Sequence, residues 1–279
     1  MTLDELRRRA LVLLQADNVT FTYNRPRKTP GVVIDDASLE IERGTVVGIL
    51  GPNGSGKTTL LRLLAGTLRP QRGVVRLDGE DLQRIPRAAL ARRFAVVAQE
   101  TQLAFEYTAL EIALMGRYPH LGAFEIEGPH DVSCALAALE STGTVPLADR
   151  PFQTLSGGEK QRVVIAAALA QLEPGPSAGD RVLLLDEPTA SLDLRYQIEV
   201  AELVRRLHAR HGITIVLSTH DLHFATAVCH EVVLLRAGRI LSRGPVATVL
   251  TAERLAALYE VDPDELRWLR GDSIPASRP

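Results

Sequence analysis

A glycine-rich stretch with the sequence GPNGSGKTT, residues 51–59, restricts the fold of this chain more than any other feature. It follows the apolar run VVGIL, residues 46–50, which is typical of a buried strand. The residues after it, LLRLL, carry apolar side chains at a spacing that favours a helix. Strand, loop and helix together match the phosphate-binding pattern G-x-x-x-x-G-K-[ST]. A glycine-rich turn that only opened a helix would not explain the lysine and threonine at the required offset, so the sequence predicts a nucleoside triphosphate site.

The loop offers several kinds of phosphate ligand. Its glycines allow successive backbone N–H groups to face a phosphate at the positive end of a helix dipole. Lys57 is predicted to reach the β- and γ-phosphates, and the hydroxyl of Thr58 to ligate Mg²⁺. The predicted nucleotide-binding residues of the loop are Gly51, Pro52, Asn53, Gly54, Ser55, Gly56, Lys57, Thr58 and Thr59.

Length and composition are those of an ordinary globular protein. With 279 residues, of which 46% are hydrophobic and 24% charged, the chain is long enough for one large α/β domain or for a core domain with a subdomain. A net charge of -2 gives no electrostatic reason to expect binding to nucleic acid or to an anionic membrane. Cys134 and Cys229 make no disulfide framework and suit a reducing cytosol. No apolar run approaches the ~20 residues of a membrane helix, and Asp4 and Glu5 argue against a signal peptide, so any role at a membrane is expected to depend on a partner.

The remaining hydrophobic pattern predicts strands that alternate with helices, and a helical insertion. Apolar or alternating runs predict strands at 18–23, 37–41, 74–77, 94–97, 182–185 and 213–217, and a closing hairpin at 232–241. Helices are expected at 3–15, 88–92, 109–115, 132–139 and 200–207, the last of them stopped by Gly212. Between about residues 100 and 160, β-branched residues become rarer while Ala and Leu increase, which indicates a mostly helical subdomain inserted in an α/β core.

Polar residues follow the ends of predicted strands at several places. Thr58 comes shortly after the strand at 46–50, Asp186 and Glu187 follow the strand at 182–185, and His220 follows the strand at 213–217. Ligands bind at the carboxyl edge of parallel α/β sheets, so these side chains are expected to meet at one site. Asp186 suits the carboxylate that holds Mg²⁺ through its water shell, and Glu187 is placed to orient and deprotonate an attacking water. Adjacent acids alone more often begin a surface loop, but the phosphate loop favours the catalytic interpretation.

A second informative run is LSGGEKQ, residues 155–161. Ser156 and Glu159 can form a capping box for a following helix. Gly157 and Gly158 fall in the first helical turn, where each costs about 1 kcal/mol relative to alanine, and a capping box has no need of them. Close approach of an anion to a bare helix N-terminus does need them. The chain's own phosphate loop is already surrounded by its own residues, so the second anion site suggests a nucleotide held by another copy, in a dimer with shared sites.

The two motifs together resemble those of the nucleotide-binding subunits of ABC transporters, and the resemblance covers nearly the whole chain. The pairing of LSGGE with GPNGSGKTT is far more specific than either motif alone. The resemblance implies that residues 12–245 form an ATP-binding cassette with a P-loop NTPase core and parallel sheet, an N-terminal antiparallel β subdomain and a helical, signature-bearing subdomain. A C-terminal helical extension and tail at 246–279 would follow.

The resemblance also implies roles for single residues. Tyr23 corresponds to the aromatic residue that stacks on adenine, Gln99 to the glutamine that senses Mg²⁺ and γ-phosphate and faces the membrane subunit, and His220 to the switch histidine that contacts the γ-phosphate. Asp193, in the run SLD at 191–193, matches the dimer-contact loop. The complete expected set is catalytic Lys57, Gln99, Glu187 and His220; metal-binding Thr58, Gln99 and Asp186; and, besides the phosphate loop, nucleotide-binding Tyr23, Ser156, Gly157, Gly158, Glu159 and Asp193.

The run MGRYPH at residues 115–120 resembles the importers of iron-siderophore, haem and cobalamin. That resemblance implies an ATPase with ATP and Mg²⁺ as cofactors, bound peripherally as a homodimer at the cytoplasmic face of the inner membrane. Its expected partners are permease subunits and, indirectly, a substrate-binding protein. Two alternatives stay open: an exporter ATPase, and a soluble ABC ATPase acting on ribosomes or DNA, although the latter usually carries two cassettes or a long coiled-coil insertion. A third, a non-hydrolysing regulatory module, is disfavoured by Glu187 and His220.

Overall fold

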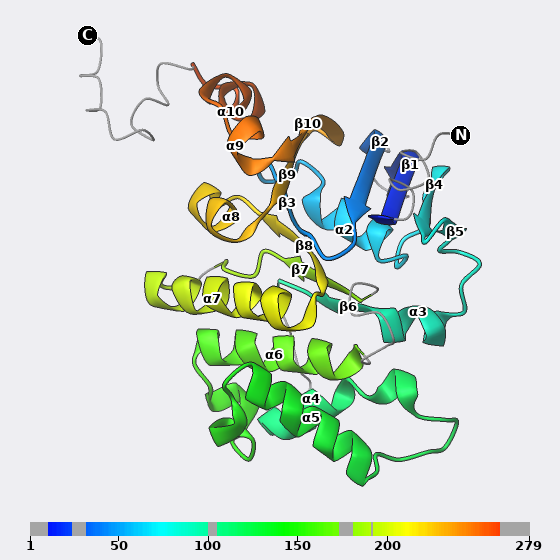
Figure 1. The fold of residues 1–279 in the computed structure, drawn as a ribbon, viewed down its shortest axis with the longest axis vertical. Coiled ribbons are helices and arrows are strands. Elements are labelled where there is room, and N and C mark those ends of the chain that lie inside the picture. Colours follow the sequence, from blue (N-terminus) through cyan, green and yellow to red (C-terminus); the bar gives the residue numbers. More distant parts are fainter. Residues whose placement is uncertain (1–10, 24–31, 100–104, 173–180, 191, 263–279) are drawn as a thin grey trace.

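The computed structural model describes residues 11–23, 32–99, 105–172, 181–190 and 192–262, which form two sheets and a set of helices (Figure 1). The strands are β1 (Val12–Thr22), β2 (Val32–Glu42), β3 (Val46–Leu50), β4 (Arg72–Leu77), β5 (Glu80–Asp81), β6 (Phe94–Val97), β7 (Val182–Asp186), β8 (Thr214–Thr219), β9 (Glu231–Arg236) and β10 (Arg239–Pro245). The helices are α2 (Lys57–Leu64), α3 (Arg87–Arg93), α4 (Ala109–Met115), α5 (Pro129–Ser141), α6 (Gly157–Gln171), α7 (Leu194–His211), α8 (Leu222–Val228), α9 (Val246–Val249) and α10 (Ala252–Tyr259).

A six-stranded sheet, in the order β10-β9-β3-β8-β7-β6, forms the centre of the molecule. Its strands from β9 to β6 run parallel, and β10 is antiparallel to β9. Every residue of β3 and β7 is buried, as expected for strands that are covered on both faces. Because these strands are parallel, the carboxyl ends of β3, β7 and β8 lie at one edge, and the phosphate loop, Asp186 and His220 are found there.

A second, antiparallel sheet has the order β2-β1-β4-β5. Here the prediction of a helix over residues 3–15 is wrong for residues 12–15, because β1 begins at Val12; residues 3–10 lie outside the described part. β1 pairs with β2 on one side and with β4 on the other, and Leu13 and Leu14 are buried. Tertiary pairing of this kind overrides a local helical pattern.

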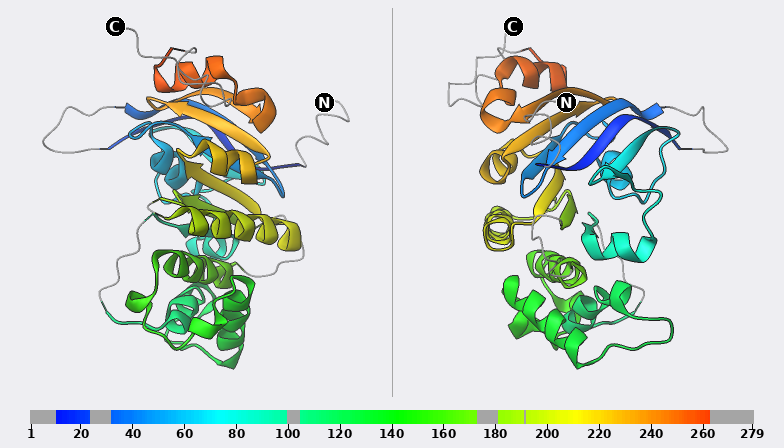
Figure 2. Two further views of the ribbon diagram at one scale, coloured as in Figure 1. Left: turned by 90° about the vertical axis from the view of Figure 1, so that its left-hand side faces the viewer. Right: turned by 45° about the vertical axis from the view of Figure 1, so that its right-hand side comes forward.

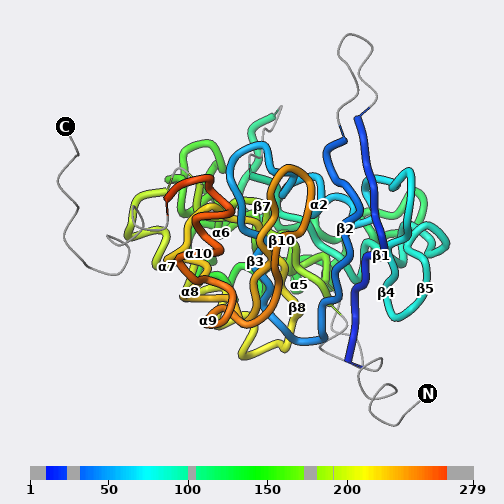
Figure 3. The backbone as a smooth tube through the Cα atoms, turned by 90° about the horizontal axis from the view of Figure 1, so that it is seen from above, coloured from blue at the N-terminus to red at the C-terminus, as the bar shows by residue number. Residues whose placement is uncertain are grey.

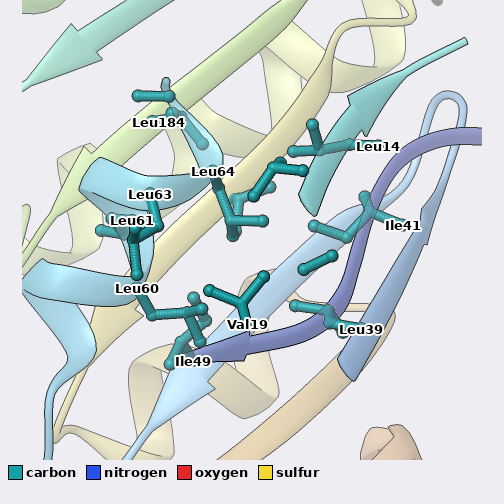
Figure 4. Close-up of a cluster of buried hydrophobic side chains, with 14 of the residues drawn as sticks. Leu14, Val19, Leu39, Ile41, Ile49, Leu60, Leu61, Leu63, Leu64 and Leu184 are labelled. Atoms are coloured by element: carbon teal, nitrogen blue, oxygen red, sulfur yellow. The ribbon is translucent and has the colours of Figure 1, made fainter. Parts of the chain in front are cut away.

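A buried hydrophobic cluster joins the two sheets through α2. Figure 4 shows members of this cluster from α2 and from both sheets: Leu14, Val19, Leu39, Ile41, Ile49, Leu60, Leu61, Leu63, Leu64 and Leu184. Since close-packed apolar side chains tolerate little displacement, α2 is fixed against the sheets. The phosphate loop at its start therefore has a fixed position as well.

Helices α4, α5 and α6 pack on one another in a layer of their own, drawn in green in Figure 2. Their shared cluster includes Ile112, Leu139 and Val163. Helix α6 also contributes Ile165 and Ala168 to the cluster beneath the parallel sheet, so it connects the helical layer to the core. The architecture thus agrees with the predicted fold class, an α/β core with a parallel sheet, an antiparallel β part and a helical part.

The C-terminal helices α9 and α10 lie on the far side of the parallel sheet from the antiparallel one. The predicted hairpin is formed by β9 and β10, and α9 and α10 then pack on the cluster shared with α7 and α8. Figure 3 shows α9 and α10 across β3 from β1 and β2. The domain limits, 12–245 with a helical subdomain at about 100–160 and an extension at 246–279, stay a prediction. In the part of the chain that the structure describes, no helix has the length and apolar character needed to cross a membrane.

Candidate nucleotide site

The phosphate loop between β3 and α2 is shaped by its glycines. Gly54 and Gly56 have φ angles of 80° and 105°, in the left-handed region that side chains rarely adopt. A Cβ at Gly56 would also lie 2.8 Å from the carbonyl oxygen of Val33. At Gly54, in contrast, no described atom lies within 4 Å of the position that a Cβ would take. The loop therefore turns tightly into α2 and leaves open space above Gly54.

A cavity of about 540 Å³ lies over the loop. Its lining combines a residue of β2, residues of the loop and of α2, and residues that follow β6, β7 and β8: Val33, Asn53, Gly54, Gly56, Lys57, Thr58, Thr59, Gln99, Glu187, Ala190 and His220. The structure thus brings the predicted catalytic residues, from four separate places in the sequence, to one cavity.

Lys57 and Glu187 form a buried ion pair at this cavity. Lys57 Nζ lies 3.2 Å from Glu187 Oε1, and the side chains are 6% and 9% exposed. Nζ also donates to the carbonyl oxygens of Gly51, at 2.9 Å, and Pro52, at 3.3 Å. On the other side, Glu187 Oε2 lies 2.8 Å from Nδ1 of His220, whose side chain is exposed. The carboxylate is therefore held between a buried ammonium group and a solvent-facing imidazole.

The backbone at Glu187 has an unusual conformation. Its φ is 49°, in the left-handed region that is uncommon for residues other than glycine. Its N–H donates to the hydroxyl and to the carbonyl oxygen of Ser218, at 3.0 Å and 3.2 Å. Backbone strain of this kind persists only where neighbouring contacts hold it. Ser218 on β8 thus holds the backbone of Glu187 in this conformation.

Thr58 and Asp186 bring two oxygen groups together. Thr58 Oγ1 donates to Asp186 Oδ1 at 3.0 Å, and Ser218 Oγ donates to the same oxygen at 2.6 Å. A hydroxyl and a carboxylate are hard oxygen ligands of the kind that Mg²⁺ prefers, so the pair fits the predicted metal site. Ser218 is absent from the predicted residues. The parallel register, in which Ser218 stands opposite Asp186, is the signal that identifies it.

Other predicted nucleotide-binding residues lie in the loop or beside it without lining the cavity. Gly51 is packed so closely that a Cβ would lie 2.1 Å from the carbonyl oxygen of Leu235. Ser55 is buried, and its hydroxyl has no hydrogen-bond partner among the described residues, so a ligand or water can satisfy it. The hydroxyl of Tyr23 lies 3.4 Å from that of Thr59. Tyr23 therefore stands beside the first turn of α2.

The LSGGE run starts α6 and lies outside the cavity lining of its own chain. The expected capping box is confirmed: Ser156 Oγ accepts from the N–H of Glu159 at 3.4 Å, and Glu159 Oε2 accepts from the N–H of Ser156 at 2.8 Å. Among the described residues, no acceptor binds the N–H groups of Gly157 and Gly158. Asp193 is exposed at the N-cap of α7 and makes no side-chain capping bond. Neither Asp193 nor the start of α6 reaches the cavity within one chain.

Close packing against another helix explains why position 158 is a glycine, and the sequence alone did not reveal this contact. A Cβ at this position would lie 2.2 Å from Cδ1 of Tyr196 on α7. The interpretation that only an approaching anion requires both glycines is therefore wrong for Gly158, because the ring of Tyr196 requires a glycine there by itself. Gly157 differs, since it is exposed and a Cβ would meet Leu192 at 3.3 Å.

Comparison with known proteins agrees with the motifs and the fold. The family described as ABC transporter matches residues 34–190. The hemin import ATP-binding protein HmuV of Myxococcus xanthus is 42% identical over 238 residues, which cover 85% of this chain and 88% of that protein. The cobalamin import ATP-binding protein BtuD of Halobacterium salinarum is 40% identical over 228 residues, which cover 82% of this chain and 55% of that protein.

Two solved structures have the same fold. A chain described as a metal-chelate type ABC transporter in an inward-facing conformation has a TM-score of 0.75 at 31% identity, over 89% of each chain. A dimeric ATP-binding cassette, MJ0796, in a post-hydrolysis state with ADP and Pi, has a TM-score of 0.71 at 28% identity, over 84% of this chain and 99% of that one. The chain therefore belongs to the ABC transporter family, as an ATPase that binds ATP.

Proposed function

We propose that this chain is the ATP-hydrolysing subunit of an importer that carries a metal chelate, such as an iron siderophore, haem or cobalamin, across the membrane. The similarity to hemin and cobalamin import proteins and to a metal-chelate type transporter supports the class of cargo. The observation that carries the hydrolytic role is the position of Glu187 between Lys57 and His220 at the carboxyl edge of the parallel sheet.

Glu187 is the proposed general base. A carboxylate at this position can accept a proton from a water that attacks the γ-phosphate. When nucleotide binds, Lys57 interacts with the phosphate oxygens and so releases one oxygen of Glu187 from its ion pair. His220 is hydrogen-bonded to the other oxygen and exposed at the cavity, so it can orient the carboxylate and reach the γ-phosphate.

Thr58, Asp186 and Gln99 are proposed to hold Mg²⁺. The hydroxyl of Thr58 and the carboxylate of Asp186 already lie 3.0 Å apart, and Gln99 lines the same cavity just after β6. Bound Mg²⁺ neutralises charge that develops on the phosphates. Tyr23, beside Thr59, is proposed to stack on the adenine ring.

A second copy of the chain is proposed to complete each nucleotide site. The N–H groups of Gly157 and Gly158, without an acceptor among the described residues, lie at the positive end of the 15-residue helix α6, which suits an anion. In a head-to-tail dimer, residues 156–159 of one copy would cover the phosphate loop of the other, and Asp193 would lie in the same interface. The similar cassette MJ0796 is described as dimeric, which supports the formation of a dimer.

Membrane permease subunits at the cytoplasmic face of the inner membrane are the proposed transport partners, with a substrate-binding protein acting indirectly. The helical layer presents exposed apolar side chains at Tyr118, Phe124 and Ile126. Exposed apolar groups near one another often mark a protein contact, and a cytoplasmic segment of the permease is the proposed occupant.

Replacement of Glu187 by Gln tests the hydrolytic role. The variant keeps the shape of the side chain but cannot accept a proton, so MgATP should bind with near wild-type affinity while steady-state hydrolysis falls about 10²–10⁴-fold. Uptake of a labelled chelate by the complete transporter should stop. Glu140→Gln, at an exposed position on α5, is the control and should leave binding, hydrolysis and uptake unchanged.

Two results would contradict the proposal in different ways. Wild-type hydrolysis by Glu187→Gln would mean that Glu187 is not the base. If the wild-type transporter hydrolyses ATP but takes up no iron siderophore, haem or cobalamin, the proposed cargo is wrong while the ATPase assignment stands.

A further inference from the structure

The hydroxyl group of Tyr259, at the end of α10, is buried without a hydrogen-bond partner. Its oxygen is inaccessible to solvent, and no group in the described part of the chain pairs with it. An unpaired buried polar group lowers stability, and buried tyrosine hydroxyls usually find a partner. The hydroxyl is thus a donor that the described part of the chain leaves unused.

Helix α10 holds this hydroxyl near the sheet edge that carries the nucleotide site. Arg236, the last residue of β9, donates to the carbonyl oxygen of Ala257 at 2.5 Å and forms an ion pair with Glu260. β9 pairs with β3, whose end leads into the phosphate loop. Figure 1 shows α10 above the end of β9. The position of α10 is therefore coupled to the strands that end at the site.

Tyr259 also packs on the cluster that supports the segment carrying His220. Leu222, the first residue of α8, belongs to that cluster. Asp221 caps α8 by accepting from two N–H groups of its first turn, and the N–H of Asp221 donates to the hydroxyl of Thr219. Residues 219–221 are thus anchored to α8, and α8 shares a packed layer with α10.

Charge connects Tyr259 with the proposed base. Burial raises the pKa of Tyr259, and the negative charge of Glu187 raises this pKa further. The phenol therefore stays protonated at neutral pH and remains a hydrogen-bond donor.

We propose that Tyr259 is a positioning residue for ATP hydrolysis: with nucleotide bound, its hydroxyl donates a hydrogen bond to residues 219–221 and so holds His220 in the hydrolytic position. The inference rests on the proposed role of Glu187, which His220 contacts. This bond gives the buried donor a partner. Through Tyr259, the C-terminal helix α10 contributes to the rate of hydrolysis.

The test is Tyr259→Phe in the full chain, which removes the hydroxyl alone. We expect kcat for ATP hydrolysis to fall about 3- to 10-fold, as for one lost hydrogen bond, with KM for ATP unchanged. Because the hydroxyl has no partner among the described residues, the melting temperature without nucleotide should stay equal or rise. Tyr107→Phe, at a half-buried position packed on the cluster of the helical layer, is the matched control and should change none of these quantities.

Two outcomes would overturn the proposal. A wild-type kcat would mean that the hydroxyl plays no part in hydrolysis. A lower melting temperature without nucleotide would mean that the hydroxyl is already bonded in the resting enzyme and has a structural role only. Glu187→Gln separates this inference from the proposed function. Normal hydrolysis by Glu187→Gln would refute the role of Glu187 as the general base. A wild-type kcat in Tyr259→Phe would refute only the role of Tyr259.

Discussion

Helices α4 and α6 begin with the same capping box, in the sequences TALE (residues 108–111) and SGGE (residues 156–159), but their surroundings differ. In α4, the N–H of Ala109 donates to the carbonyl oxygen of Arg150 at 3.1 Å. The N–H of Leu110 donates to the carbonyl oxygen of Ala148 at 2.9 Å. In α6, the N–H groups of the two glycines bind no acceptor in the described ranges.

The difference teaches that a capping box alone does not define the role of a helix start. The chain closes the start of α4 with its own carbonyl oxygens, so that start is structural. The start of α6 is fixed by an identical box, yet two of its N–H donors find no acceptor among the described residues. Open donors on a fixed helix start are what an anion from another molecule requires.

The largest expected effect comes from placing arginine at each N-cap. Ser156→Arg and Thr108→Arg both lose the cap, which costs about 1 kcal/mol of stability. Ser156→Arg also places a bulky side chain where the partner's phosphate would approach, so its ATPase kcat should fall at least about 10²-fold. Thr108→Arg should keep nearly normal activity. Measuring kcat and melting temperature for both variants checks this, and equal losses of activity would remove the distinction between the two helix starts.

The glycines of α6 should respond differently from one another. Gly158→Ala drives a Cβ into the ring of Tyr196, and such overpacking costs about 1–3 kcal/mol. At about 2–4 °C per kcal/mol, the melting temperature should fall by several degrees. Gly157→Ala is exposed and should lose little stability or gain some, because alanine favours the helix. Equal melting temperatures for the two variants would contradict the packing that the structure describes.

The smallest effect is a pH dependence that the two boxes should share. The backbone N–H of Thr108 lowers the pKa of Glu111, and that of Ser156 lowers the pKa of Glu159, from an ordinary value of 4.5. A lowered pKa in the folded state means that the charged box stabilises the fold above about pH 4.5 and that this contribution is lost as pH falls through the folded pKa. The melting temperatures of Glu111→Gln and Glu159→Gln should therefore be lower than that of the wild type at neutral pH. This difference should narrow below pH 4.5. A gap that is independent of pH would show that the carboxylate charge plays no part.

Sequence reasoning predicted the features that short runs of consecutive residues encode. The phosphate loop, the capping box of Ser156 and Glu159, and the polar residues after the strands each occupy a short run, and the parallel sheet then brings the strand ends together. The hairpin of β9 and β10 and the stop of α7 at Gly212 follow the same logic.

The features that were missed depend on contacts between distant segments. β1 extends back to Val12 because it pairs with two strands, which a local helical pattern cannot reveal. Gly158 and Tyr196 meet across two helices, and Ser218 reaches Asp186 from the neighbouring strand. Residue 191 of the SLD run lies outside the described residues.

The central claim is that each nucleotide site uses Lys57 of one copy and Ser156 of the other, and mixing experiments test it most directly. In a mixture of Lys57→Ala with Ser156→Arg, the shared-site account predicts ATPase activity, because the heterodimer has one site that carries neither change. In a mixture of wild type with the double variant, it predicts no active site in the heterodimer, since each site then contains one damaged component. The opposite pair of results, no activity in the first mixture and activity proportional to the amount of wild-type chain in the second, would contradict the account.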